Sequence, residues 1–377
     1  MKLETLHLVS FRNYIDQTVA FGKGINILYG DNAQGKTNVV EAVHLLATGK
    51  SHRTKHLSDM IMHGENSFIL EAEVRDTERQ QQIHLSYDEK TGKGMRVNEV
   101  LRTRWSELLG LMHVLLFSPE TMDIVKGGPS ERRRFIDILL CQMDTRYLRA
   151  LQLYTATLRN KAAALRDRNG FTRYRGMLPV WNESMAASGA YVAQRRRQTI
   201  RRLEVLANRE LSVISEGRET LSMSLQTFTG KETLQETEAL RAFLLGKLEK
   251  NAHREEEAAQ CLIGVHRDEI LIQLNECTAR EFASQGQQRS IVLSLILACM
   301  HLYREETGEL PILLLDDVMS ELDPHRRDYL LSMLADTQTL ITTTDKLALE
   351  NRFSEGTDYY EVRSGTVNRV CQDGAVS

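Results

Sequence analysis

The chain has 377 residues, which is enough for a large core and for two or three domains. Its hydrophobic content of 42% and charged content of 26% are ordinary for a globular protein, and no apolar run reaches the ~18 residues that a membrane-spanning helix needs. The five cysteines are scattered and form no C-x-x-C pair, which argues against a disulfide framework and a zinc site. Because the N-terminus also lacks the pattern of a signal peptide, we expect a cytoplasmic protein with no membrane partner.

The formal net charge of −3 is unevenly distributed along the chain. Residues 121–260 contain 24 Lys and Arg against 17 Asp and Glu, a local charge of +7, so the remainder carries −10. A basic middle segment is typical of a surface that binds a polyanion. Solvated helix faces would give the same composition, and both interpretations stay open at this point.

The first predicted elements surround a phosphate-binding loop. Residues 1–9 alternate like a strand, residues 24–29 read as a buried strand, and residues 38–46 have helical spacing. The segment between the second strand and the helix is Gly30-Asp31-Asn32-Ala33-Gln34-Gly35-Lys36-Thr37, and it fits the pattern G-x-x-x-x-G-K-[ST]. Asn38 follows it directly. Glycines let backbone N–H groups face phosphate oxygens, and the helix N-terminus adds its positive dipole end. Lys36 is expected to reach the β- and γ-phosphates, and Thr37 is expected to ligate Mg²⁺.

The middle of the chain changes from strands to helices. The spacing predicts strands at residues 67–74, 82–87 and 111–117, and then helices at 132–143, 147–168 and 186–210. No heptad repeat extends over many turns, so a compact helical arm is favoured over a long coiled coil. The pattern then predicts a strand at 268–274, a helix at 286–304 and buried strands at 311–316 and 338–344. These elements predict an α/β domain in two parts, residues 1–125 and 263–377, with a basic helical arm at 126–262.

The buried strand at 311–316 ends in two carboxylates, Asp316 and Asp317. Ligands bind α/β sheets at the carboxyl ends of parallel strands. Asp316 is therefore the candidate for holding Mg²⁺, and Asp317 for orienting the attacking water. The alternative is an acidic turn with no further role.

A second turn of small residues opens the helix predicted at 286–304. It contains Ser284, Gly286 and Gln287, and a helix N-terminus of this kind can bind an anion. A serine at this place is also an ordinary helix cap.

The order of these elements resembles that of ABC-type ATPases, and in particular the SMC-like branch, which interrupts the ATPase between the phosphate loop and the S-x-G-x-Q turn. More specifically, the chain resembles the RecF family of bacterial recombination mediators from residue 3 to about 370. The segments that carry this resemblance are residues 10–14, 116–120, 132–137, 264–268, 284–289, 313–318 and 342–344. The resemblance implies a P-loop ABC-type ATPase domain with a mixed or parallel sheet and an inserted α-helical arm.

The resemblance also implies a function. Members of this family bind ATP and Mg²⁺, pair as ATP-dependent homodimers, hydrolyse ATP slowly, bind double-stranded DNA near single-stranded gaps, and work with RecO and RecR to load RecA. In the paired state, each nucleotide lies between the phosphate loop of one subunit and the S-x-G turn of the other. Carried onto this sequence, the nucleotide contacts beyond the phosphate loop are Arg12, Ser284, Gly286, Gln287, Asp323 and Thr343, and the catalytic residues are Lys36, Asp316 and Asp317.

The sequence departs from the ABC pattern at three places. Asp317 stands where many relatives have glutamate, residues 117–120 stand where a glutamine loop is expected, and Thr343 or Thr344 stands where many relatives use histidine. Tyr14, beside Arg12, is either a nucleotide contact or a core aromatic residue.

DNA contacts are assigned to the densest arginine cluster of the arm, namely Arg195, Arg197, Arg201 and Arg202, which suit phosphate contacts without base readout. A second cluster, residues 132–134, is a candidate either for DNA or for the contact between arm and ATPase. The alternative functions are the nucleotide-binding subunit of a membrane transporter and a structural DNA-binding protein with a vestigial nucleotide site.

Overall fold

The computed structural model describes the chain except for residues 78, 168–174, 231–233, 345–355 and 371–377. It divides into two compact units, one formed by Met1–Met122 with Val292–Ser377 and the other by Asp123–Ile291. We refer to them as the first and the second unit. Residues 263–291, which the sequence analysis assigned to the ATPase part, group with the helical arm in the second unit.

An antiparallel sheet forms one layer of the first unit, with the strand order β2-β1-β4-β5-β6-β7. Its strands are β1 (Lys2–Phe11), β2 (Tyr14–Ala20), β4 (Ser67–Arg75), β5 (Gln80–Asp88), β6 (Gly92–Val97) and β7 (Val100–Arg102). Along β4, every second side chain from Phe68 to Val74 is buried. This alternation is what a sheet with one face on the core requires.

A second, mostly parallel sheet forms the other layer, with the order β15-β14-β3-β13-β12-β8. Its strands are β3 (Ile25–Tyr29), β8 (Val114–Phe117), β12 (Ile312–Asp316), β13 (Thr339–Thr343), β14 (Thr357–Arg363) and β15 (Thr366–Val370). Among the described strands of this sheet, β14 and β15 pair antiparallel and the other neighbours pair parallel. The central strand β13 lies between β3 and β12, with Thr343 opposite Tyr29 and Thr342 opposite Asp316. The carboxyl ends of strands from both ends of the sequence therefore meet at one edge.

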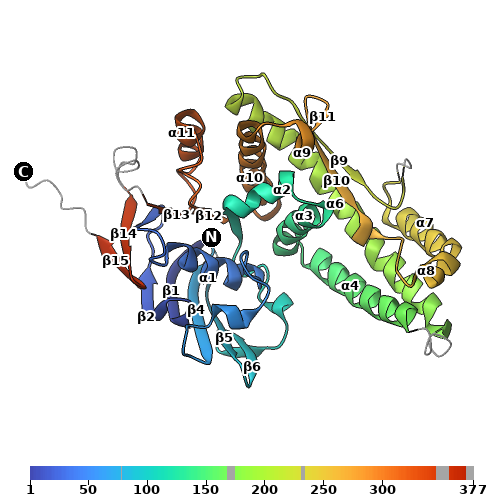
Figure 1. Cartoon of the computed structure of the whole chain (residues 1–377), viewed down its shortest axis with the longest axis horizontal. Helices are drawn as coiled ribbons and strands as arrows, with labels where there is room; N and C mark the ends of the chain where they lie inside the picture. The colour runs from blue at the N-terminus through green and yellow to red at the C-terminus, as the bar shows by residue number, and fades with distance from the viewer. Residues whose placement is uncertain (78, 168–174, 231–233, 345–355, 371–377) are drawn as a thin grey trace, which may run out of the picture. The chain divides into compact units, whose positions relative to one another are not determined.

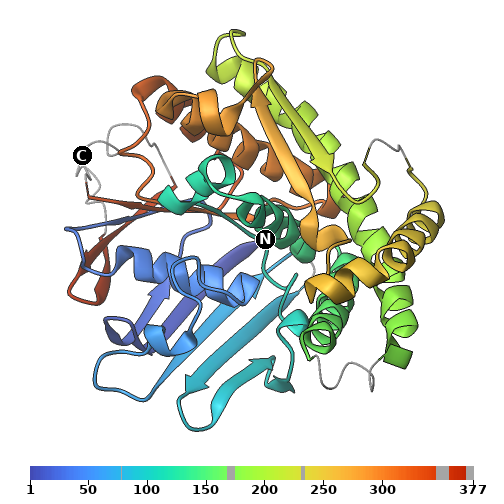
Figure 2. The same ribbon diagram turned by 45° about the vertical axis from the view of Figure 1, so that its right-hand side comes forward.

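Helix α1 (Lys36–Thr48) packs between the two sheets, against β4 of one and β8, β12 and β13 of the other (Figure 1). Nearly all of its side chains are buried, which explains why its apolar positions are not confined to a single stripe. One continuous core joins α1 to the inner faces of both sheets. Short helices complete this unit: η1 (Leu57–Met60), η2 (Trp105–Glu107), η3 (Pro119–Met122) and α11 (Pro324–Ser332). Figure 2 shows the strands of the antiparallel sheet, in blue to cyan, side by side with α1.

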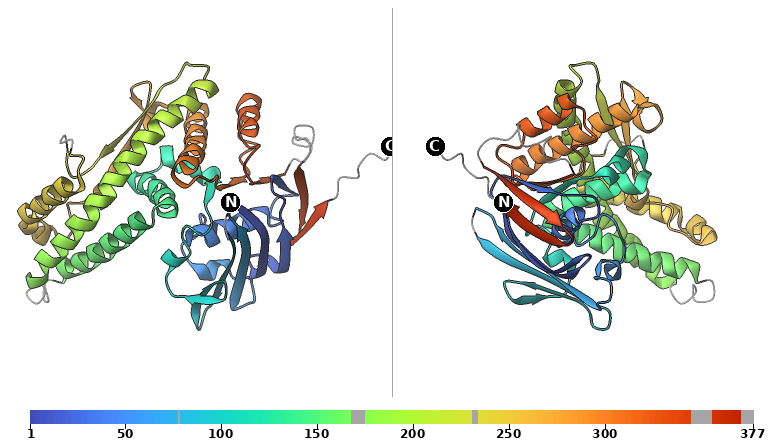
Figure 3. Two further views of the ribbon diagram at one scale, coloured as in Figure 1. Left: turned by 180° about the vertical axis from the view of Figure 1, so that it is seen from behind. Right: turned by 60° about the vertical axis from the view of Figure 1, so that its left-hand side comes forward.

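The second unit is mainly helical. Its helices are α2 (Asp123–Lys126), α3 (Pro129–Met143), α4 (Thr145–Arg166), η4 (Arg175–Met177), α6 (Leu178–Ile214), α7 (Thr237–Lys250), α8 (Ala252–Ala258), η5 (Val265–Arg267) and α9 (Ala279–Phe282). The long helix α6 packs along α4 and α7 (Figure 3). A small antiparallel sheet of β9 (Leu221–Gln226), β10 (Glu269–Leu274) and β11 (Cys277–Thr278) packs on α6 through β9. Helix α10 (Gln285–Thr307) begins in this unit and continues into the first.

The predicted fold class is confirmed as an α/β architecture with a mixed sheet and a helical region inserted between its two sequence segments. None of the helices in the described part of the chain combines the length and apolarity needed to cross a membrane.

Candidate nucleotide-binding site

The phosphate loop connects β3 to α1, and two of its glycines are required by close packing. Gly30 has a φ of +151°, and a Cβ there would collide with the carbonyl oxygen of Val362 on β14. Gly35 has a φ of +121°, and a Cβ would lie 2.7 Å from the Tyr14 hydroxyl oxygen. Only glycine tolerates such backbone angles and such approaches. The neighbouring strands therefore determine the shape of the loop.

Hydrogen bonds fix the loop from two sides. The carbonyl oxygen of Gln34 accepts from Asn13 Nδ2 at 2.8 Å and from the Gly365 N–H at 3.1 Å. The Tyr14 hydroxyl donates to the Gly35 carbonyl at 3.0 Å. Tyr14 is fully buried, and burial raises the pKa of its hydroxyl, so it acts as a neutral donor. Of the two interpretations of Tyr14, the structure shows a core aromatic residue that also supports the loop.

Lys36 rests against the loop itself. Its Nζ donates to the carbonyls of Gly30 at 2.7 Å and Asp31 at 2.6 Å. Burial lowers the pKa of this ammonium, and the carboxylates of Asp317, Asp316 and Asp31 oppose that effect. A lysine held by two carbonyls, with three carboxylates within electrostatic range, is well placed to exchange those carbonyls for phosphate oxygens.

Thr37 and Asp316 bring the two halves of the site together. Thr37 Oγ1 donates to Asp316 Oδ1 at 3.0 Å, and Thr342 Oγ1 donates to the same oxygen at 2.6 Å. Burial raises the pKa of Asp316, although both hydroxyl donors and His52 oppose that shift. Thr342 was not among the predicted site residues. Thr342 could have been identified from its position opposite Asp316 in the neighbouring strand, but the sequence does not give the register of the two strands.

Asp317 and Asp323 occupy the segment after β12. Asp317 is exposed, adopts a left-handed φ of 53°, and its backbone N–H donates to Thr342 Oγ1 at 2.9 Å. Asp323 caps α11 by accepting from the Arg326 N–H at 3.0 Å and also pairs with the Arg326 guanidinium. Partial burial would raise the pKa of Asp323, but these contacts lower it. Thr343 is buried at the end of β13.

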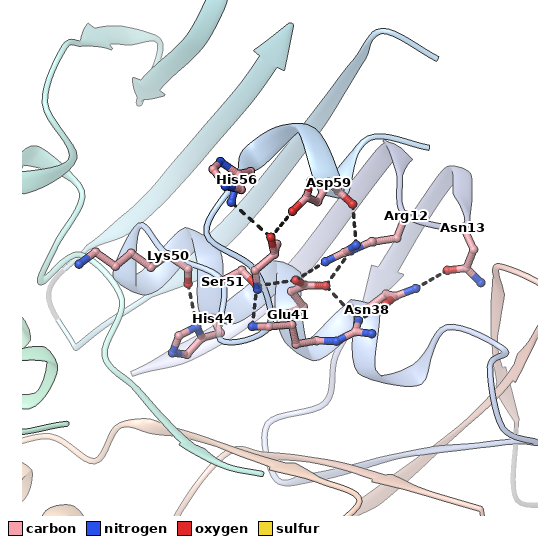
Figure 4. Close-up of polar contacts among 11 residues, drawn as sticks. Arg12, Asn13, Asn38, Glu41, His44, Lys50, Ser51, His56 and Asp59 are labelled. Carbon is pink, nitrogen blue, oxygen red and sulfur yellow. Dashed lines mark hydrogen bonds and ion pairs between the residues drawn. The ribbon is translucent and has the colours of Figure 1, made fainter. Parts of the chain in front are cut away.

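Arg12 lies in the β1–β2 turn and is engaged with the chain. Its Nε and Nη2 donate to both carboxylate oxygens of Glu41 at 2.9 and 2.7 Å, and its Nη1 donates to the Asp59 carbonyl at 2.5 Å (Figure 4). A contact between Arg12 and a nucleotide stays a prediction. Glu41 was missed by the sequence analysis, because a carboxylate within a helix is ordinarily exposed.

The S-x-G-x-Q turn belongs to the second unit. The Ser284 backbone N–H donates to Gln287 Oε1 at 2.9 Å, and the Gln287 N–H donates to Ser284 Oγ at 3.3 Å. This reciprocal pair is a capping box at the start of α10, so Ser284 does serve as a helix cap. Ser284 is exposed and Gly286 is half-buried. The capping role leaves the predicted nucleotide role of the turn untested.

The four arginines of α6 that were predicted to contact DNA differ in their surroundings. Arg195 donates to Asp144 Oδ2 at 2.9 Å, and Arg197 donates to the Leu234 carbonyl and to Thr229. Arg201 and Arg202 are exposed. The predicted DNA contacts therefore differ in how accessible they are, and the two exposed ones are the stronger candidates.

The cluster at residues 132–134 is tied to the interior of the second unit. Arg132 is buried and pairs with Glu269 on β10 at 2.8 Å, and Arg133 donates to the Asp268 carbonyl at 2.5 Å. These two arginines hold α3 against β10, which favours a structural role for them.

The residues at or just after the carboxyl ends of β3 and β12 fit a magnesium-bound nucleotide. Thr37 and Asp316 present a hydroxyl and a carboxylate oxygen 3.0 Å apart beside the loop, and Mg²⁺ prefers oxygen ligands. Among the described residues, no group of three or more His, Cys, Asp or Glu side chains could hold a metal ion without help. Mg²⁺ bound beside phosphates usually keeps several waters and one or two protein ligands, and Thr37 and Asp316 are the residues that would hold it.

Along nearly its whole length, the chain is similar to proteins of one family. The model of the RecF/RecN/SMC N terminal domain family matches residues 2–367. The DNA replication and repair protein RecF of Symbiobacterium thermophilum is 39% identical over 370 residues, which cover 97% of this chain and 98% of that protein. RecF of Desulfitobacterium hafniense is 39% identical over 372 residues, which cover 98% of this chain and 100% of that protein.

Solved structures give the same result. A recombination mediator protein RecF with ATP, described as part of the RecFOR pathway, has a TM-score of 0.90 at 32% identity and covers 98% of this chain and 97% of its own. An Smc head domain from Pyrococcus furiosus has a TM-score of 0.57 at 16% identity and covers 98% of this chain and 95% of its own, which shows a shared fold alone. The chain therefore belongs to the RecF family of DNA replication and repair proteins, within the RecF/RecN/SMC group of ATPases.

Proposed function

We propose that this protein is an ATP-dependent DNA-binding protein of recombinational repair and replication restart. The hydrogen bond between Thr37 and Asp316 carries the proposal, because it joins the phosphate loop to the acidic strand end that a magnesium–nucleotide site requires. The structure of a RecF relative with ATP supports ATP as the nucleotide.

In this proposal, the backbone N–H groups from Gly30 to Asn38 surround the phosphates of ATP. Lys36 moves from the Gly30 and Asp31 carbonyls to the β- and γ-phosphates. Thr37 and Asp316 would hold Mg²⁺, which would supply positive charge beside the phosphates. Asp317, exposed beside Asp316, orients the attacking water. Its side chain is one methylene shorter than the usual glutamate, which fits a slow ATPase that serves as a switch.

ATP is proposed to bring two copies of the chain together. Ser284, Gly286 and Gln287 of one copy would contact the γ-phosphate bound by the other, with Asp323 and Thr343 nearby. A nucleotide can shift a pairing equilibrium only if it binds the paired state better, and a γ-phosphate shared by two subunits has that property. Hydrolysis would remove the shared charge and let the pair separate.

The proposed partners are double-stranded and gapped DNA together with RecR and RecO, which would help to load RecA. The exposed Arg201 and Arg202 support contacts to DNA phosphates, with Arg195 and Arg197 as further candidates. The structures of relatives described as members of the RecFOR pathway support RecO and RecR. Because its proposed substrate is the bacterial chromosome, we place the protein in the cytoplasm.

The test measures the binding of a fluorescently labelled gapped duplex by fluorescence anisotropy, with and without ATP and Mg²⁺. Wild-type protein should bind more tightly with ATP, and Lys36→Met should not respond to ATP. Lys50→Met is the matched control, because Lys50 is an exposed lysine just beyond α1. Equal DNA affinity with and without ATP in the wild type would contradict the proposal.

The alternative of a transporter subunit is disfavoured, because the two curated relatives described above are RecF proteins along nearly their whole length. A structural protein with a vestigial site is disfavoured by the intact contacts of Lys36, Thr37 and Asp316.

A further inference from the structure

One buried carboxylate near the phosphate loop accepts four hydrogen bonds. Glu41 lies on α1, and its side chain is completely buried. It accepts two hydrogen bonds from Arg12, one from Ser51 Oγ at 2.5 Å and one from Arg53 Nη1 at 3.2 Å (Figure 4). None of these residues belongs to the phosphate loop.

The partners of Glu41 come from separate segments. Arg12 is in the β1–β2 turn and has a left-handed φ of 57°. Ser51 and Arg53 follow α1, where Ser51 Oγ also accepts from the Arg53 N–H at 2.9 Å and the Thr54 N–H at 3.1 Å. The carboxylate of Glu41 thus holds a turn before the loop and a segment after α1 against the helix that the loop begins.

The connection from Glu41 to the loop is short. Asn13 is adjacent to Arg12, and its Nδ2 donates to the Gln34 carbonyl of the loop at 2.8 Å. Asn13 Oδ1 accepts from Asn38 Nδ2 at 2.8 Å, and Asn38 Oδ1 accepts from Arg53 Nη1 at 2.8 Å. Arg12 is therefore the sequence neighbour of Asn13, which holds the loop, and Arg53 is hydrogen-bonded to Asn38 in the first turn of α1.

The electrostatics of this cluster favour a charged Glu41. Burial alone would raise the pKa of the carboxyl group, but Arg12, Ser51 and Arg53 outweigh it and lower the pKa. A buried ion pair is often no more stabilising than apolar residues of similar volume, so stability is a weak reason for this arrangement. A buried network with its hydrogen bonds satisfied does, however, hold the groups around it in one geometry.

We propose that Glu41 is a positioning residue of the nucleotide site. It holds the Arg12–Asn13 turn and the Ser51–Arg53 segment so that Gln34 and the phosphate loop are in their binding shape before the nucleotide arrives. It raises ATP affinity without touching the nucleotide. This inference rests on the proposed function, namely that the loop binds ATP.

The test compares nucleotide affinity with stability in the full-length chain. Glu41→Gln keeps the shape of the side chain but removes the charge and part of its acceptor capacity. The dissociation constant for a fluorescent ATP analogue is expected to rise roughly tenfold, by analogy with the loss of affinity when a residue that orients a metal ligand is removed. Glu4→Gln is the matched control, because Glu4 pairs with Arg75 at 2.6 Å in the same unit. That variant should keep wild-type affinity.

A double-mutant cycle separates positioning from a general loss of structure. If Glu41 acts through the turn, Glu41→Gln with Asn13→Ala should bind the analogue no more weakly than Asn13→Ala alone. Additive losses, or an unchanged affinity of Glu41→Gln with only a lower melting temperature, would overturn the proposal. If Glu41→Gln does not fold, Ser51→Ala carries the same test, because it leaves the Glu41 carboxylate in place and removes one of its hydrogen bonds, together with the two that Ser51 Oγ accepts from the Arg53 and Thr54 N–H groups. Wild-type protein that binds no ATP analogue would instead overturn the proposed function.

Discussion

Thr37 and Asp316 lie 279 positions apart in the sequence, and their side chains are joined by a 3.0 Å hydrogen bond. The parallel sheet explains this contact. The loop that follows β3 and the end of β12 lie on either side of β13, which pairs with both strands. An insertion as large as the second unit is therefore compatible with an intact site, because strand pairing rather than sequence proximity brings the two halves together.

The first prediction concerns Asp316. Asp316→Asn keeps the size of the side chain but loses the charge that Mg²⁺ needs, so the variant should lose most of the ATP affinity that Mg²⁺ adds and keep its affinity without Mg²⁺. Calorimetric titrations with and without Mg²⁺ measure both quantities. Asp358→Asn, on β14 of the same sheet, is the control. A full Mg²⁺ effect in the Asp316 variant would argue against this residue as the metal ligand.

The second prediction concerns the turn at the start of α10. Ser284→Arg should leave ATP binding by the monomer intact and abolish ATP-dependent pairing, because a long cation would occupy the place of the γ-phosphate contact. The lost cap should cost about 1 kcal/mol of stability. Ser284→Thr keeps both the cap and the hydroxyl and should still pair. Size-exclusion chromatography with ATP distinguishes the variants, and a dimer of Ser284→Arg would refute the assignment.

The third prediction concerns DNA. Alanine at both Arg201 and Arg202 should weaken binding to any sequence and reduce the slope of log K against log salt by roughly 2, since each phosphate contact contributes about one unit. Arg195→Ala should change the slope less, because Asp144 already engages that arginine. DNA titrations at several salt concentrations test this. An unchanged slope in the double variant would place the DNA contacts elsewhere.

The fourth prediction concerns pH and the outer face of the antiparallel sheet. His7 Nε2 contacts Asp16 at 2.8 Å, His7 Nδ1 contacts Glu71 at 3.2 Å, and His84 Nδ1 contacts Glu71 at 2.8 Å. Partial burial would lower the pKa of His7, but the two carboxylates raise it above 6.5. His84 and then His7 lower the pKa of Glu71 below 4.5 against the effect of burial.

The pH dependence of stability follows from these directions. The contribution of His7 is complete below pH 6.5 and is lost as the pH rises through its folded-state pKa. The contribution of Glu71 is present above pH 4.5 and is lost as the pH falls through its folded-state pKa. Urea unfolding should therefore show the largest stability difference between wild type and His7→Gln between these two values, with His63→Gln as an exposed control. A difference that does not vary with pH would contradict this.

The sequence was most informative where a local pattern determines the chemistry. The phosphate loop, the buried strand before Asp316 and the helical arm were all predicted from residue types and spacing, because glycines, apolar runs and helical periodicity act over short distances. Thr342, which was not among the predicted site residues, shows the limit of such reasoning. Which hydroxyl meets Asp316 depends on the register between two strands, and the sequence carries no direct sign of that register.

Long-range packing accounts for the other differences. In the arginine cluster of α6, Arg196 was given no role, yet it is buried and pairs with Asp137 and Asp268. Consecutive residues on a helix point in different directions, and only the tertiary structure shows which of them meets an acidic partner. The β14–β15 hairpin was also not predicted, although it supports the loop through Val362 and Gly365. Such contacts are formed by segments more than 300 positions from the loop.

Sedimentation velocity with and without ATP and Mg²⁺ tests the central claim most directly. We predict a monomer without nucleotide and a shift to a dimer with ATP and Mg²⁺, with no shift for Ser284→Arg. A chain that stays monomeric while ATP is bound, or that pairs equally well without nucleotide, would contradict it.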